Sequence, residues 1–128
     1  MQFGDFVRSI LTAAAAHRRI RLFLSMDFST ALFTLHSRAL SSGGAKHSCA
    51  IVHRRVFIGC VILLVKFVSD SATIYTSDFL DILPLGMRIR CCVRVLNRLE
   101  AVVWRLVGGV VLHLPETRPP SALASPFQ

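Results

Sequence analysis

Two adjacent cysteines, Cys91 and Cys92, lie between arginines in the C-terminal half of the chain. Thiols beside a basic surface are suited to reversible acylation if this region rests against a membrane. Two acyl chains would then give stable anchoring. A cysteine pair is no acylation motif by itself, so a pair of partly buried thiols is the alternative.

Arginine recurs at helical spacing over residues 87–107, which predicts a basic amphipathic helix. Four of these side chains fall on or near one side: Arg90, Arg94, Arg98 and Arg105. Such a helix can lie on an anionic membrane, with the guanidinium groups on lipid phosphates. Nucleic acid is a less favoured partner, because Trp104 is the one aromatic residue of this segment and no nucleic-acid motif accompanies it. A core-packing helix with a solvated charged face is the third alternative.

The remaining chemical motifs are incomplete. His47, Cys49 and His53 offer nitrogen and sulfur ligands within one short segment, but a structural zinc site needs four ligands and no fourth lies nearby. No metal or other cofactor is therefore predicted. The acidic residues are scattered and form no acid/base pair, and the signatures of hydrolases and phosphate-binding loops are absent. We accordingly expect no enzyme.

The composition indicates a membrane setting. Of the 128 residues, 53% are hydrophobic and 17% are charged, whereas a soluble domain carries about 25% charged residues. The formal net charge is nevertheless +8, carried by thirteen Arg and two Lys, and Arg suits contact with phosphate groups. The abundance of Leu, Ser and Arg has a second interpretation, because these residues have the most codons. A dubious or recently arisen open reading frame without evolved function would show the same bias.

One apolar run, VFIGCVILLVKFV at residues 56–68, approaches the character of a membrane span. Its aliphatic and aromatic residues, counted to residue 74, favour insertion by about 3 to 7 kcal/mol, while Lys66 opposes it by about 2.5 to 3.5 kcal/mol and Asp70 by less. The balance is near zero. Residues 56–75 are therefore a marginal transmembrane segment, a buried apolar segment, or a strand at 56–68. Basic residues before the run and acidic ones after it would place its N-terminal side in the cytoplasm.

The N-terminus predicts an amphipathic helix with an apolar stripe that includes Phe3, Phe6 and Ile10. Its arginines, with few acids nearby, would also suit an organellar targeting segment. A secretory signal is not predicted, because the apolar region is short and the charged start is mixed. The cysteine spacing shows no disulfide framework either, so we do not expect secretion.

These elements predict a mostly α chain, with an irregular α+β fold or no stable fold as alternatives. Five segments are expected: a helical region at 1–40, a flexible loop at 41–48, the apolar segment at 49–76, a short turn and the basic helix at 77–114, and a disordered tail at 115–128. The function expected first is a small basic membrane-associated protein with no assignable biochemical activity. The unselected reading frame and a soluble nucleic-acid-binding module are the two alternatives.

Overall fold

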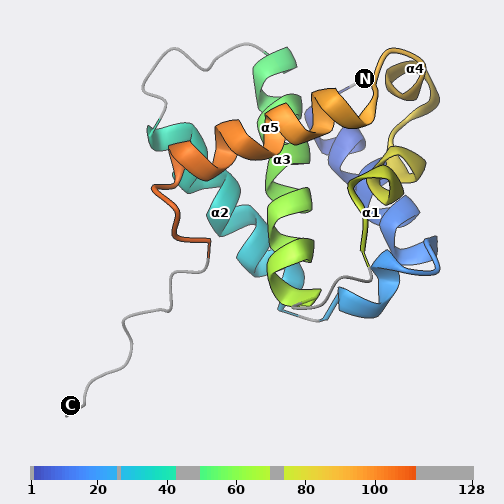
Figure 1. Ribbon diagram of the computed structural model, residues 1–128, viewed down its shortest axis with the longest axis horizontal. Helices are drawn as coiled ribbons and strands as arrows, with labels where there is room; N and C mark the ends of the chain where they lie inside the picture. Colours follow the sequence, from blue (N-terminus) through green and yellow to red (C-terminus); the bar gives the residue numbers. More distant parts are fainter. Residues whose placement is uncertain (1, 26, 43–49, 70–73, 112–128) are drawn as a thin grey trace.

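The computed structural model describes residues 2–25, 27–42, 50–69 and 74–111 (Figure 1). Of the residues described, 79% are helical and none forms a strand, so the predicted mostly α class is confirmed and the strand at 56–68 is wrong. The predicted tail at 115–128 and most of the predicted loop lie outside the described residues. The elements are α1 Phe3–Ala16, η1 Ile20–Phe23, α2 Phe28–Ser42, α3 Ala50–Ser69, η2 Thr76–Ile82, α4 Leu85–Arg88 and α5 Val93–Leu106, where η denotes a 3-10 helix.

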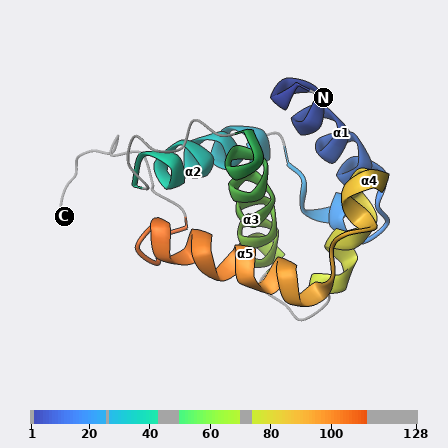
Figure 2. The same cartoon turned by 90° about the horizontal axis from the view of Figure 1, so that it is seen from above.

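Helix α3 forms the centre of the fold. The other long helices, α1, α2 and α5, pack around it, with α2 and α5 on opposite sides when the molecule is seen from above (Figure 2). Every side chain from residue 56 to residue 65 is buried, which is why this run is apolar all round rather than on one stripe. No helix in the described part of the chain combines the length and apolarity that crossing a membrane requires. The buried-segment alternative is thus the one that the fold supports.

Lys66 lies in the apolar run of α3 but forms polar contacts with two other elements. Its ammonium group donates hydrogen bonds to Glu100 Oε1 at 2.9 Å and to Thr76 Oγ1 at 2.8 Å. The lysine therefore joins α3 to α5 and to η2. Its charge is satisfied within the protein, so snorkelling towards a membrane surface is not needed to explain it.

Helix α1 is amphipathic as predicted and buries Phe6, Val7, Ile10 and Ala14. The predicted helical region at 1–40 is divided into α1, η1 and α2, since the chain leaves helical geometry after Phe23 and turns at Asp27. Arg38 of α2 then reaches the far end of α5. It donates to the backbone oxygens of Val107, Val110 and Val111 at 3.3, 2.6 and 3.3 Å, which satisfies carbonyls that a helix end leaves without partners.

The helix predicted over residues 87–107 is also divided, into α4 and α5. Cys92 between them is extended, with φ −140° and ψ 172°. The Arg88 side chain holds α4 against η2 by donating to the backbone oxygens of Asp81 and Leu83, whereas α5 must cross α3, so the chain changes direction between the two helices. Gly108 and Gly109 follow the end of α5 with φ values of 67° and 78°, a left-handed conformation that suits glycine and ends the helix.

Candidate functional site

The turn that joins α4 to α5 exposes apolar side chains. We call residues 85–94 the α4–α5 corner; it lies at the edge of the molecule (Figures 1 and 2). Ile89 and Leu85 are 75% and 70% exposed, more than any other large hydrophobic residue in the described part, and Val93 is 36% exposed. These apolar side chains therefore do not contribute to the hydrophobic core. Helical spacing of apolar residues is typical of a buried face, so the sequence alone does not reveal that these two side chains are exposed.

The predicted arginines surround and extend this corner. Arg94, Arg98 and Arg105 are exposed along one face of α5, and Arg90 is exposed in the turn before it. Trp104, 48% exposed, lies beside this face. The ion pairs formed within the described ranges use Arg8, Arg19 and Lys66 as their basic partners. Arg94, Arg98 and Arg105 therefore share one face of α5, whereas Arg90 lines a pocket before it, and none of the four forms an ion pair within the described ranges.

The two cysteines at the corner differ in environment. Cys91 is half-buried, and burial raises the pKa of its thiol. Cys92 is exposed, and its pKa is lowered by the backbone N–H groups of Val95 and Arg94 in the first turn of α5, and to a smaller extent by the charges of Arg94 and Arg98. The pair predicted from sequence is thus one shielded thiol and one accessible thiol that ionises more readily.

A second cluster, which the sequence did not suggest, brings together His17, Asp78 and Asp81. Its donor set resembles a metal site, but its hydrogen bonds oppose one. His17 Nδ1 accepts the backbone N–H groups of Arg19 and Ile20 at 3.1 and 3.3 Å, so the ring proton is on Nε2, which donates to Asp81 at 3.1 Å. A protonated Nε2 has no lone pair for a metal. The cluster instead joins the end of α1 to η2.

The histidine and cysteine candidates of the central segment do not form a ligand set in the described part. His47 and Cys49 lie outside the described residues. His53 lies in α3, where its ring centre is 6.4 Å from that of His36 and 6.0 Å from that of Phe3. Its ring therefore belongs to an aromatic cluster between α1, α2 and α3.

No protein-family model, curated protein or solved structure matches this chain. The described residues define the class as a small, mostly α chain with an exposed corner that is both apolar and basic.

Proposed function

We propose that this protein binds the surface of anionic membranes through the α4–α5 corner. The observation that carries the proposal is the exposure of Leu85 and Ile89 beside a row of arginines. Interfacial binding needs both features, because the apolar side chains enter the boundary between headgroups and acyl chains while the guanidinium groups stay on the phosphates. Binding of this kind requires no membrane-spanning helix.

The expected strength follows from the groups involved. Each arginine near an anionic surface contributes about 1 kcal/mol, and each fully buried Leu or Ile contributes about 1.5 to 3 kcal/mol. Four arginines and two aliphatic side chains would therefore give reversible binding that falls with added salt. An acyl chain on exposed Cys92 would strengthen it further.

Vesicle flotation tests the proposal. The full chain is expected to float with vesicles that contain phosphatidylserine and to remain below vesicles of phosphatidylcholine alone. Replacing Leu85 and Ile89 together with Ser is expected to weaken binding by at least about ten-fold, because both side chains then lose their apolar contact. Since both are exposed, the fold should persist in the variant.

The matched control changes two exposed apolar residues elsewhere, Leu22→Ser and Val68→Ser, and is expected to bind as the unchanged chain does. Equal binding by the corner variant and the unchanged chain would overturn the proposal. If Arg94→Gln with Arg98→Gln abolished binding while the corner variant bound normally, charge alone would be responsible, and Leu85 and Ile89 would have no part.

A further inference from the structure

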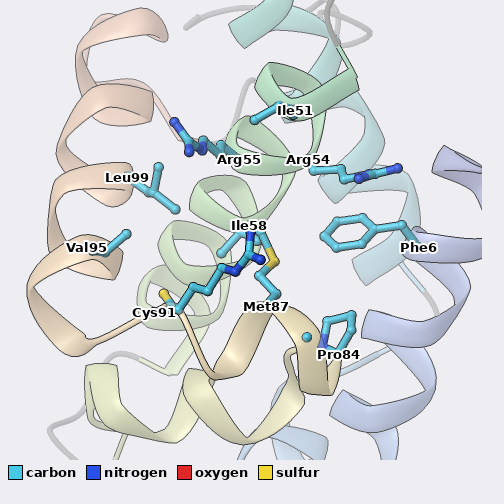
Figure 3. A pocket seen from close by; sticks show the side chains of 12 residues that line it. Phe6, Ile51, Arg54, Arg55, Ile58, Pro84, Met87, Cys91, Val95 and Leu99 are labelled. Atoms are coloured by element: carbon cyan, nitrogen blue, oxygen red, sulfur yellow. The ribbon is translucent and has the colours of Figure 1, made fainter. Parts of the chain in front are cut away.

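A pocket of about 520 Å³ lies behind the corner, between α3, α4, α5 and the side chain of Phe6 from α1 (Figure 3). Its volume falls within the range of about 300 to 1,000 Å³ that is usual for small-molecule sites. The exposed side chains of Leu85 and Ile89 do not line it. The pocket therefore includes Gly86, Met87, Arg90 and Cys91 of the corner, but not the two exposed aliphatic side chains that are proposed to enter a membrane.

The lining has an unusual chemical composition. Its residues are Phe6, Ile51, Arg54, Arg55, Ile58, Pro84, Gly86, Met87, Arg90, Cys91, Val95 and Leu99. Three are arginines and none is acidic, and apart from these arginines and one thiol every lining side chain is apolar or absent. No lining side chain offers an oxygen as a hydrogen-bond acceptor.

That composition selects among ligand classes. Peptides, sugars and nucleosides carry N–H or O–H donors, which would lose their hydrogen bonds to water without gaining side-chain acceptors here. A ligand whose polar part only accepts hydrogen bonds avoids this cost. A carboxylate on a long alkyl chain has that character, because its oxygens match the guanidinium fork and the rest of the molecule is apolar.

The arrangement of the lining fits such a molecule. In Figure 3, Arg54 and Arg55 lie towards one end of the pocket, whereas Met87 and Pro84 lie towards the other. The guanidinium carbon of Arg54 is 5.8 Å from the centre of the Phe6 ring, which holds that arginine against α1. Arg55 is exposed, as is Arg90, so both can meet a ligand from solvent. Ile58 and Leu99 provide apolar surface between the two ends.

We infer that this pocket binds a long-chain carboxylate anion, with its carboxylate on the pocket arginines and its alkyl chain along Ile58, Leu99 and Met87. Charge complementarity supports the head, and the apolar lining supports the chain. The pocket shares Arg90 with the basic surface, but Arg54, Arg55 and the apolar lining take no part in the proposed membrane contact.

Titration calorimetry of the full chain with dodecanoate, below its micelle-forming concentration, tests the inference. Dodecanol tests the need for the charge, and hexanoate tests the need for the chain. Dodecanoate is expected to bind at one site and at least about ten-fold more tightly than either, since each fully buried methylene strengthens binding by about four-fold. Absence of binding, or equal binding of dodecanol, would overturn the inference.

Two double variants with the same change in net charge locate the site. Arg55→Gln with Arg90→Gln is expected to weaken dodecanoate binding by at least about ten-fold, because both side chains line the pocket. Arg94→Gln with Arg98→Gln removes as much charge outside the pocket and is expected to change binding by less than about three-fold. Equal weakening by the two variants would contradict the site, as general charge attraction would then explain the binding.

A third variant tests the pocket without changing charge. Met87→Trp places a larger side chain in the pocket at a half-buried position and is expected to weaken dodecanoate binding. Far-UV circular dichroism checks that each variant keeps its helices. The variant with Leu85 and Ile89 replaced by Ser should bind dodecanoate normally, so failure of the membrane proposal and failure of the pocket inference can be told apart.

Discussion

Gly59 of α3 lies against the backbone of Leu99 in α5. A Cβ atom at position 59 would be 2.8 Å from the Leu99 carbonyl oxygen and 2.5 Å from Val103 Cγ2, closer than real Cβ atoms approach. The missing side chain therefore allows α5 to cross directly over the central helix. This contact also positions Leu99 at the wall of the pocket.

Replacing Gly59 with Ala is expected to destabilise the fold. The new methyl group must push α5 away from α3, and overpacking of this kind costs about 1 to 3 kcal/mol. Urea unfolding followed by circular dichroism measures the change. Gly4→Ala is the matched control, because nothing lies within 4 Å of its added Cβ in α1 and alanine favours a helix; it should be neutral or stabilising by up to about 1 kcal/mol. Equal stability of Gly59→Ala and the unchanged chain would contradict the close crossing.

The ion pair between Lys66 and Glu100 joins the same two helices. The two side chains are 31% and 22% exposed, so solvent screens the pair only in part. A double-mutant cycle with Lys66→Met and Glu100→Gln is expected to give a coupling free energy of about 1 kcal/mol by urea unfolding. The exposed pair of Asp5 and Arg8, 56% and 75% exposed, should give less than about 0.5 kcal/mol in a matching cycle. A coupling near zero for the first pair would show that it does not hold α5 on α3.

The sequence predicted the helical class because helical periodicity and glycine stops are local signals. The amphipathic stripe that includes Phe3, Phe6 and Ile10 became α1, and Gly108 with Gly109 ended α5. Local signals did not determine the breaks. The division at Cys92 arises from tertiary packing, since α4 is held on η2 while α5 crosses α3 at Gly59. The helical spacing of the sequence continues through this turn, so it does not predict the break.

The site was predictable only in part, for a related reason. The exposed arginines and the cysteine pair could be named from residue type, because the chemistry of a guanidinium or a thiol does not depend on which residues pack beside it. The pocket combines Phe6, Arg55, Met87 and Leu99, which lie far apart in sequence. The ion pair of Lys66 could not be predicted for the same reason, since Glu100 contacts Lys66 only because α5 packs on α3. Pairwise contacts of this range carry no periodic signal.

Protonation of His36 is expected to destabilise the fold. Burial lowers the pKa of this side chain below its ordinary value of 6.5, and its ring stacks on Phe3 at 5.4 Å while Nε2 lies 3.4 Å from the backbone oxygen of His53. The unfolded chain therefore binds a proton at His36 more readily than the folded chain does. The stability that neutral His36 contributes is present above pH 6.5 and is lost as the pH falls below that value.

Thermal unfolding between about pH 7.5 and about pH 5.5 measures this effect, which one proton limits to about 1.4 kcal/mol per pH unit. His36→Phe keeps an aromatic ring beside Phe3 but cannot be protonated, and it should lose less stability over the same interval. Identical pH dependence of the variant and the unchanged chain would rule out His36 as the cause.

The three cysteines within the described residues are expected to react with iodoacetamide in the order Cys92, Cys91, Cys60. The lowered pKa of exposed Cys92 increases its thiolate fraction at neutral pH, burial raises the pKa of Cys91, and deep burial raises that of Cys60 to about 12. Peptide mass spectrometry after short labelling at pH 7 assigns the rate at each position. Cys60 should become reactive only when the protein is unfolded in urea.

Arg94→Gln with Arg98→Gln should move the labelling midpoint of Cys92 to higher pH, but only slightly, because the backbone N–H groups of α5 are the larger cause of the lowered pKa. Arg8→Gln, on α1, serves as the control and should leave the midpoint unchanged. Faster labelling of Cys91 than of Cys92 would contradict the assignment. If the order holds, Cys92 is the thiol on which acylation of the corner should first be sought, since it is both accessible and the more readily ionised of the pair.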